Sequence, residues 1–257
     1  MVTRHSQIRL YVDAPLHEGA VVALSRDHAH YLHVVMRKSQ GTQLALFNGH
    51  DGCFLAEITQ LTRKSGEVMC LSLQEAQWYG PDLWLLFAPV KKARLDFMAQ
   101  KATELGASVI WPVRTDYCQI KAIKDERLVA NAIEAAEQTE RLDLPEIRAF
   151  SDLNTLLDDW PDDRALLFCD ERISGDHNYD AARILPQITE KKAAILIGPE
   201  GGFSMAEKAK IDALKNVYSL SLGPRILRAD TAALSALSLY QAHRGDWRSD
   251  WRGDGSK

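Results

Sequence analysis

The stretch between residues 193 and 239 constrains the fold most strongly, because it contains one pattern twice. In the first copy, a continuous apolar run at residues 193–197 leads directly into the Gly-Pro-Glu-Gly-Gly sequence of residues 198–202. In the second copy, a predicted strand at residues 218–222 meets another Gly-Pro pair, and a helix is predicted at residues 231–242. We expect two buried parallel strands whose loops lie side by side at the carboxyl ends of adjacent strands, where open α/β sheets bind ligands.

The residues of the two loops indicate a ligand of nucleoside size. Glycine permits close backbone approach and proline removes a hydrogen-bond donor, so the loops are stiff and present mainly carbonyl groups. The sequence has neither a phosphate-binding P-loop nor the glycine spacing of a dinucleotide-binding fingerprint. Ser204 and Glu207 form a predicted capping box, which starts the helix after the first loop.

Two tight turns without a function are the alternative interpretation of the glycine pattern. The charged residues of the loops favour a site, because a plain turn is satisfied by Asn or Ser. These residues are Glu200, Arg225, Arg228 and Asp230. Purely structural roles stay open for two of them: Asp230 as the N-cap of the last helix, and Arg228 as an ion-pair partner of Glu200.

The composition is that of a globular protein. The chain has 257 residues, 46% of them apolar, and a net charge of -4, so an RNA-binding surface must be a local patch. No apolar run is long enough to span a membrane and the N-terminus lacks the layout of a signal peptide, so we expect a cytoplasmic protein. The four cysteines lack metal-ligand spacing and are expected to be buried free thiols, and the histidines of the first fifth of the chain are interpreted as surface or interface residues.

Two domains are predicted from the change in hydrophobic period. Residues 1–75 contain short β segments separated by turns, and one helix with Ser25 as its N-cap, which favours a small β-barrel. After a linker that contains Gly80 and Pro81, residues 82–245 alternate strands and helices, which predicts a parallel sheet with helices on both faces. Residues 246–257 are expected to form a mobile tail.

The expected elements can be given as ranges. Strands are expected at residues 8–12, 20–24, 42–47, 53–59, 67–73, 83–90, 109–113, 165–170, 193–197 and 218–222. Helices are expected at residues 26–36, 95–105, 125–141, 152–160, 179–188 and 231–242, besides the helix that Ser204 starts.

Basic residues occur at two places that suit RNA. Lys91, Lys92 and Arg94 follow a predicted strand, at the same sheet edge as the two loops. They form either a phosphate-binding patch or an ordinary solvated helix start. Arg9 and Arg37 are candidates for phosphate contacts on the first domain.

Together these motifs resemble the RsmE family of small-subunit rRNA uridine-N3 methyltransferases, in the SPOUT superfamily. The most specific segments are IGPEGGFS at residues 197–204 and LGPRILRADTA at residues 222–232. The resemblance extends over nearly the whole chain through HYLHVVMR at residues 30–37, LFNGHDG at 46–52, KATELGA at 101–107, AAEQTER at 135–141 and Pro145-Glu146.

The resemblance implies a fold and an activity. The implied fold is a PUA-like β-barrel at residues 1–75 followed by a SPOUT trefoil-knot domain at residues 82–245, and the knot would be an exception to the rule against threaded chains. The implied activity is methylation of N3 of a uridine in 16S rRNA, with S-adenosylmethionine as donor and no metal. The enzyme would act as a homodimer on rRNA within the small ribosomal subunit, without contact to a membrane.

The matched motifs also imply which residues serve this activity. Asp230 would take the N3 proton or orient the uracil, and Arg225 and Arg228 would stabilise the uracil anion. Because N3 lies on the Watson–Crick edge, the base must be unpaired or flipped out. The residues expected to hold the donor are Leu167, Leu196, Ile197, Gly198, Pro199, Glu200, Gly201, Gly202, Leu220, Leu222, Gly223, Ile226 and Leu227, with residues 167–170 as a third wall.

Two positions depart from the family pattern, and two other functions compete with it. Asp230 replaces the usual glutamate, and Tyr117 lies near a position where the family often has an arginine, so one possible RNA contact is missing. A non-catalytic RNA-binding or ribosome-assembly factor would keep the fold without binding the donor, but the intact loop motifs argue against it. A dinucleotide-dependent enzyme would need the missing glycine fingerprint.

Overall fold

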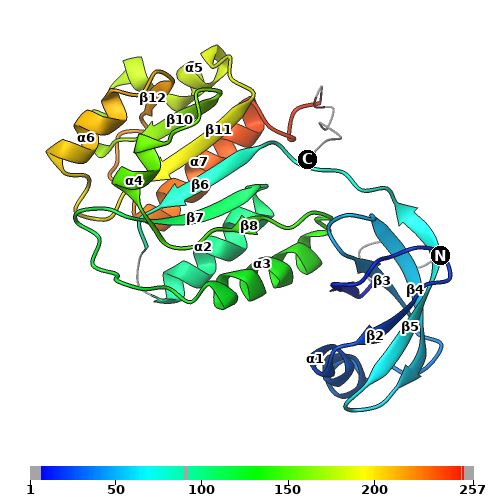
Figure 1. The fold of residues 1–257 in the computed structure, drawn as a ribbon. Helices are drawn as coiled ribbons and strands as arrows, with labels where there is room; N and C mark the ends of the chain where they lie inside the picture. Colours follow the sequence, from blue (N-terminus) through cyan, green and yellow to red (C-terminus); the bar gives the residue numbers. More distant parts are fainter. Residues whose placement is uncertain (1–6, 90–91, 250, 252–257) are drawn as a thin grey trace. The chain divides into compact units, whose positions relative to one another are not determined.

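The computed structural model describes residues 7–89, 92–249 and 251. The described chain divides into two compact units (Figure 1). The first unit contains residues up to 79 together with residues 136–144, and the second contains residues 80–135 and the chain from residue 145 onward. No helix in the described part of the chain is both long and apolar enough to cross a bilayer.

The first unit is built on a five-stranded sheet with the order β1-β3-β4-β5-β2. Its core contains apolar side chains from all five strands and from the helix α1 (Arg26–His30). Ser25 caps this helix as predicted, but the expected helix at residues 26–36 continues as a π-helical turn at Tyr31–Val35. The strands lie close to their predicted positions: β1 at Arg9–Tyr11, β2 at Val21–Leu24, β3 at Gln43–Phe47, β4 at Cys53–Leu61 and β5 at Gly66–Glu75.

The turn between β3 and β4 shows why this sequence forms a hairpin. The Asn48 side chain accepts hydrogen bonds from the backbone N–H groups of His50 and Asp51 at 3.0 and 2.9 Å, which closes the turn. The two strands then pair antiparallel, with Phe47 opposite Cys53. Residues 48–52 therefore form the hairpin turn between two of the expected strands.

The second unit is an α/β structure around a seven-stranded sheet. The order along the sheet is β12-β10-β11-β6-β7-β8, with β9 paired to β7, and every described pairing in it is parallel. The parallel sheet predicted from the alternating pattern is therefore confirmed. Its strands are β6 (Leu83–Phe87), β7 (Val109–Arg114), β8 (Glu146–Ile147), β9 (Ser151–Asp152), β10 (Arg164–Cys169), β11 (Lys192–Ile197) and β12 (Val217–Leu220).

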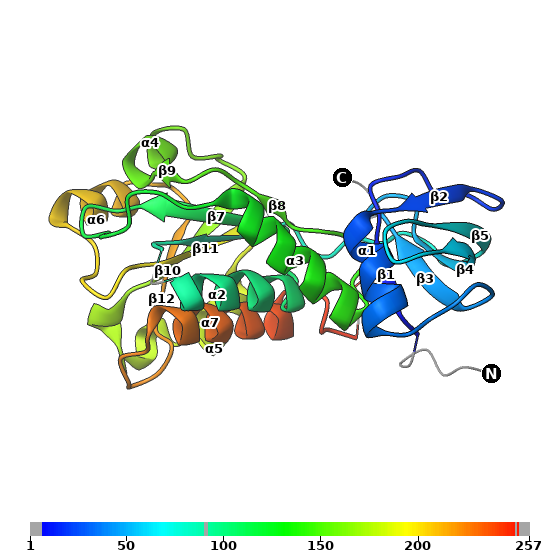
Figure 2. The ribbon, with the colours of Figure 1, turned by 90° about the horizontal axis from the view of Figure 1, so that it is seen from below.

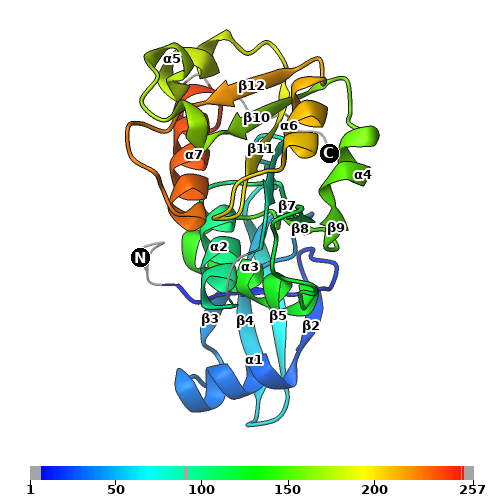
Figure 3. The same ribbon diagram turned by 90° about the vertical axis from the view of Figure 1, so that its left-hand side faces the viewer.

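Helices cover both faces of this sheet, as Figures 2 and 3 show. Alternate residues of each strand point to opposite faces, so Ile195 packs with α2, α5 and α7, whereas Leu196 packs with α4 and α6. Gly106, with φ at +78°, follows the end of α2, which is the helix expected at residues 95–105. The helices are α2 (Lys92–Glu104), α3 (Asp125–Thr139), α4 (Leu153–Asp158), α5 (Ala181–Ile184), α6 (Met205–Asp212) and α7 (Ala229–His243).

Some predictions of local structure were wrong. The helix expected at residues 179–188 is broken into α5 between short 3₁₀ turns at His177–Tyr179 and Leu185–Gln187. Pro186 explains the second break, because it has no N–H for a helical hydrogen bond. The four cysteines are thiols outside disulfides, but only Cys53 and Cys70 are buried, and Cys118 and Cys169 are partly exposed. Most of the tail expected at residues 246–257 lies outside the described residues.

Candidate functional site

Three parallel strands end at the same level and define the site. Ile197 of β11 pairs with Cys169 of β10, and Cys169 pairs with Leu220 of β12. The prediction that the two Gly-Pro loops follow adjacent strands is wrong, because β10 lies between β11 and β12. The segment after β10 therefore lies between the two loops.

The loop after β11 is closely packed. A Cβ on Gly198 would lie only 2.5 Å from the Phe203 ring, so only glycine fits there. Gly202 has φ at +68° and its N–H donates to the Pro199 carbonyl at 2.9 Å. The loop thus forms a tight turn over a buried aromatic ring.

The helix that follows is capped as predicted. The Ser204 hydroxyl accepts from the Glu207 N–H at 3.2 Å, and the Glu207 carboxylate accepts from the Ser204 N–H at 2.8 Å. Glu207 is fully buried and also accepts from the Asp116 N–H at 2.8 Å. The capping box therefore connects the first loop to the segment after β7.

The loop after β12 has fewer contacts. Gly223 has φ at +102°, and its carbonyl accepts from the Gly175 N–H at 3.1 Å. The Ile226 side chain is 78% exposed. Arg228 is the N-cap of α7, but its side chain makes no capping hydrogen bond.

The segment after β10 supplies polar groups between the loops. Burial raises the pKa of the Cys169 thiol to about 12, so this thiol is neutral at physiological pH. Burial also opposes ionisation of Asp170, but hydrogen bonds from the Arg172 side chain and backbone outweigh it and lower the pKa of Asp170. Asp170 is therefore a fixed negative charge.

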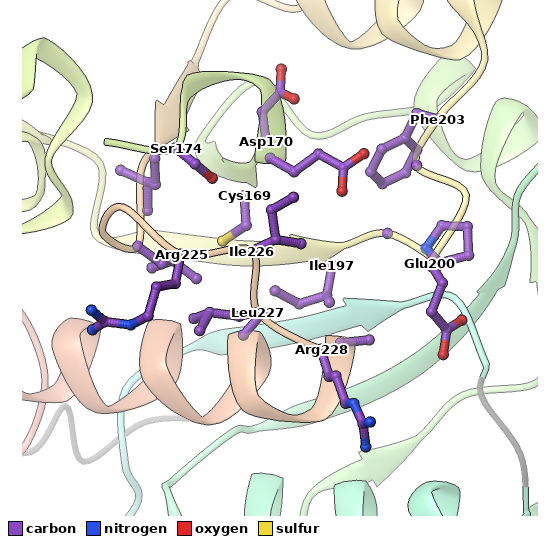
Figure 4. Close-up of a pocket in the computed structure, with 18 of the residues that line it drawn as sticks. Cys169, Asp170, Ser174, Ile197, Glu200, Phe203, Arg225, Ile226, Leu227 and Arg228 are labelled. Atoms are coloured by element: carbon purple, nitrogen blue, oxygen red, sulfur yellow. The ribbon is translucent and has the colours of Figure 1, made fainter. Parts of the chain in front are cut away.

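The three segments enclose a cavity of about 210 Å³ (Figure 4). Its apolar walls and nearby backbone suit a flat ring, and its carboxylates and cations suit a polar, charged tail. The lining residues are Cys169, Asp170, Glu171, Ser174, Ile197, Gly198, Pro199, Glu200, Gly202, Phe203, Lys208, Leu220, Leu222, Arg225, Ile226, Leu227, Arg228, Ala229 and Ala232.

The cavity brings together most of the residues expected to hold a donor. Leu167 and Leu196 do not line it, because both point into the hydrophobic cores on opposite faces of the sheet. Gly201 and Gly223 belong to the two loops but do not line the cavity. The expected residues that do line it are Ile197, Gly198, Pro199, Glu200, Gly202, Leu220, Leu222, Ile226 and Leu227.

The three candidate catalytic residues take different positions. Arg225 and Arg228 line the cavity, but their guanidinium groups extend away from its centre (Figure 4). Asp230 lies in the first turn of α7, where its side chain accepts from the Thr231 N–H at 2.9 Å. The N-cap of this helix is Arg228, so the alternative of Asp230 as N-cap is wrong.

Glu200 pairs with a different arginine from the one considered in the sequence. Arg94 Nη1 lies 3.4 Å from Glu200 Oε1, and Arg94 Nε lies 3.8 Å from Asp230 Oδ2. Within the described residues, Arg228 forms no ion pair with Glu200. From α2, Arg94 therefore links the first loop to the start of α7.

The other candidate RNA-binding residues are scattered. Arg9 is half-buried in the first unit, with its guanidinium 5.2 Å from the centre of the Phe47 ring. Arg37 is exposed and has φ at +53°. Lys91 lies outside the described residues, and Lys92 begins α2 but its side chain is not described.

Sequence reasoning missed six lining residues, two of which are Ala229 and Ala232 at the start of α7. Glu171 and Ser174 follow β10, and the rule that ligands bind at the carboxyl ends of parallel strands includes them only once β10 is known to lie between β11 and β12. Phe203 directly follows the glycines and was available as an aromatic signal. Lys208 lies one turn into α6, and nothing in its local sequence marks it. The described residues contain no cluster of side chains suited to a metal ion.

Comparison with known proteins adds sequence relatives. A family model described as an RNA methyltransferase domain matches residues 79–241. The ribosomal RNA small subunit methyltransferase E of Rickettsia conorii is 33% identical over 90% of this chain and 93% of that protein. The protein of the same name from Bacillus subtilis is 29% identical over 90% of this chain and 95% of its own length.

Two solved structures resemble the chain over most of its length. A methyltransferase of Legionella pneumophila in complex with SAM has a TM-score of 0.81 and 32% identity, covering 93% of this chain and 99% of that one. A ribosomal RNA small subunit methyltransferase E of Neisseria gonorrhoeae bound to S-adenosylmethionine has a TM-score of 0.82 and 25% identity, covering 94% and 100%.

Proposed function

The chain belongs to the RsmE family of small-subunit ribosomal RNA methyltransferases, and we propose that it transfers the methyl group of S-adenosylmethionine to N3 of a uridine in 16S rRNA. The observation that carries this proposal is the cavity at the ends of β10, β11 and β12, which both sequence motifs line. The matched RNA methyltransferase domain spans both motifs. The proposal therefore gives the two loops one shared ligand.

The residues of the cavity fit S-adenosylmethionine. Ile197, Leu222 and Ile226 suit the faces of an adenine ring. The carboxylate of Asp170 suits a donor with positive sulfonium and ammonium groups. When bound, the donor supplies a methyl carbon made electrophilic by the positive sulfur.

The acceptor nitrogen needs a group that takes its proton. N3 of neutral uracil carries a proton and lies on the Watson–Crick edge, so the uridine enters the site unpaired or flipped out. Asp230, with a side chain only 18% exposed, accepts this proton or orients the base. Arg225 and Arg228 add positive charge at the rim, which favours the uracil anion.

The first unit contributes binding of RNA. Its five-stranded sheet acts as a PUA-like β-barrel for residues 1–75, and the motif at residues 30–37 supports this role. Arg37 contacts RNA phosphates, with Lys91 and Lys92 as further cations on the second domain. Arg9 would have to leave its position beside Phe47 to reach a phosphate, so Arg37 is the stronger candidate.

The second domain, at residues 82–245, forms the SPOUT trefoil knot. The resemblance of its two loop motifs to SPOUT enzymes supports this topology. Two copies of the chain form a homodimer, which acts in the cytoplasm on 16S rRNA within the small ribosomal subunit.

The test is a methyl-transfer assay with labelled S-adenosylmethionine. The purified protein is incubated with small ribosomal subunits from cells that lack its gene, and the rRNA is digested to identify any methylated nucleoside. Subunits from cells that retain the gene serve as the control, because their site is already methylated. N3-methyluridine at one site is expected.

Two other outcomes would contradict the proposal. Donor binding without transfer would exclude this substrate. Absence of donor binding would favour the ribosome-assembly factor, and calorimetry with S-adenosylmethionine separates the two cases.

A further inference from the structure

Arg94 lies between the two loops that form the cavity. From the first turn of α2, it reaches Glu200 in the first loop at 3.4 Å and Asp230 at the start of α7 at 3.8 Å. The side chains of Arg94 and Asp230 are 36% and 18% exposed, so both are partly shielded from water. Within the described residues, Arg94 is the sole ion-pair partner of Asp230.

Arg225 and Arg228 are placed differently. Both line the cavity, but their guanidinium groups extend away from its centre, and neither forms an ion pair within the described residues (Figure 4). We propose that Arg94 binds a carbonyl oxygen next to N3 of the target uracil, and stabilises the negative charge that develops when Asp230 takes the N3 proton. This inference rests on the proposed function and names the residue that recognises the base.

The geometry leaves Arg94 free to bind a base. Its distances to Glu200 and Asp230, 3.4 and 3.8 Å, are longer than those of ordinary charge-assisted hydrogen bonds. A guanidinium has five N–H donors, so two loose carboxylate contacts do not use them all. The Glu200 side chain is 64% exposed, and its contact with Arg94 is easily replaced by a ligand.

A carboxylate beside a guanidinium matches the edge of uracil. This edge presents a carbonyl acceptor, the N3–H donor and a second carbonyl acceptor. Asp230 is suited to accept from N3–H, while Arg94 donates to a neighbouring carbonyl oxygen. Cytosine has no proton on N3 and carries an amino group in place of one carbonyl, so the same two residues disfavour cytidine.

The methyl transfer then balances as follows. The N3–H bond breaks, and the proton goes to the Asp230 carboxylate. The electron pair left on N3 forms the new bond to the methyl carbon, and the methyl–sulfur bond breaks with its electrons remaining on sulfur. Before the new bond forms, negative charge on the uracil spreads to the carbonyl oxygen beside Arg94, where a fixed cation stabilises it.

The test compares Arg94→Met and Arg94→Lys with Arg127→Met. Arg127 of α3 pairs with Asp96, which lies in α2 as Arg94 does. Arg127→Met therefore removes an arginine–carboxylate pair that lies outside the cavity. Single-turnover methyl transfer to small ribosomal subunits is measured from about pH 6 to about pH 9. Donor binding is measured by calorimetry. The described ion-pair partners of Arg94 are Glu200 and Asp230, and both Arg94 variants keep them.

We expect Arg94→Met to slow transfer about 100-fold at neutral pH, with donor affinity unchanged. Arg94→Lys recovers part of the rate, and Arg127→Met equals the wild type. The deficit of Arg94→Met shrinks as pH rises, because hydroxide then ionises N3 without help from the protein. It also shrinks for subunits assembled on rRNA that contains 5-fluorouridine, because the fluorine makes N3 more acidic.

Two results would overturn this role for Arg94. A deficit that is equal at every pH and with 5-fluorouridine would mean that Arg94 only holds the loops together. A deficit explained by weaker RNA binding with a reduced salt dependence would assign Arg94 to a phosphate. Absence of transfer by the wild type would instead overturn the proposed function, and this inference with it.

Discussion

The loops after β11 and β12 share one sequence pattern, but the first is held by neighbouring side chains. Phe203 packs so close to Gly198 that no Cβ fits between them. The ring of Phe203 is in turn fixed by an edge contact with Phe168, with 5.2 Å between ring centres. Buried Glu207 then connects the capping Ser204 with the segment after β7.

The second loop lacks such support. Ile226 is mostly exposed, and within the described residues the side chains of Arg225 and Arg228 have no hydrogen-bond or ion-pair partner. Segments with few buried contacts open at lower free energy than the core. A repeated strand–Gly-Pro–helix pattern therefore fixes where a loop begins, while distant side chains decide how rigid it is.

Gly198→Ala is expected to have the largest effect. Its Cβ would meet the Phe203 ring at 2.5 Å, so the loop must shift. We expect the free energy of unfolding to fall by about 3 kcal/mol, measured by urea denaturation, and donor binding to weaken more than about tenfold by calorimetry.

The matched control is Gly223→Ala in the second loop. A Cβ there meets nothing within 4 Å, and only the φ of +102° opposes it. We expect a loss of about 1 kcal/mol. If Gly198→Ala and Gly223→Ala lost the same donor affinity, the first loop would not be more rigid than the second.

Glu207→Gln is expected to have the next largest effect. The buried carboxylate accepts from two backbone N–H groups at 2.8 Å, and an amide would turn its NH₂ group toward one of them. We expect the free energy of unfolding to fall by about 2 kcal/mol in urea denaturation. Asp230→Asn is the control in the second loop's helix, with an expected change below about 0.5 kcal/mol. If Asp230→Asn lowered the free energy of unfolding more than Glu207→Gln does, the first loop would not be the more firmly held of the two.

Ile226→Ser is expected to affect binding alone. Its side chain lines the cavity but is 78% exposed, so the folded protein loses little packing. Loss of apolar contact of about 1 kcal/mol should weaken S-adenosylmethionine binding about fivefold in calorimetry. Met205→Ser provides the control, because Met205 is also 78% exposed but does not line the cavity. The same loss of donor affinity in both variants would contradict a contact between Ile226 and the donor, because Met205 does not line the cavity.

Asp170→Asn is expected to have the smallest effect, and it tests the wall between the loops. Burial works against the charge, but the Arg172 hydrogen bonds outweigh it, so the pKa of Asp170 is lowered in the folded state. A lowered folded pKa adds stability above the ordinary carboxyl pKa, and this stability is lost as pH falls through the folded pKa. The difference in unfolding free energy between wild type and variant should therefore be constant above about pH 5 and shrink in more acidic solution. A difference that does not change in acid would mean that Asp170 contributes through packing.

Much of the fold follows from local sequence. Continuous apolar runs predicted the parallel strands, and the spacing of Ser204 and Glu207 predicted a capping box that the structure contains. The helix expected at residues 179–188 failed because Pro186 interrupts an otherwise helical pattern. Local rules work where the interaction partners are close in sequence.

The site was less predictable because it depends on strand order. Nothing local to β10 says that it lies between β11 and β12, and so Glu171 and Ser174 were missed. Arg94 was expected to contact phosphate or to lie at a solvated helix start. Its partners Glu200 and Asp230 were not foreseen, because they lie more than a hundred positions away in the sequence. Pairings over such separations are set by the topology of the sheet.

The order of the strands also has a consequence for synthesis of the chain. Strand β6 pairs with β11, and Leu83 lies opposite Ala193. The centre of the sheet therefore cannot form until residue 193 has left the ribosome. Long-range pairings of this kind make folding slow and leave apolar strands exposed in the nascent chain. Among the strands that the structure describes, β12 pairs only with β10, and it completes the cavity wall. A nascent chain that stalls before Leu220 consequently has most of its hydrophobic residues but no complete donor site, and it would depend on chaperones until translation resumes.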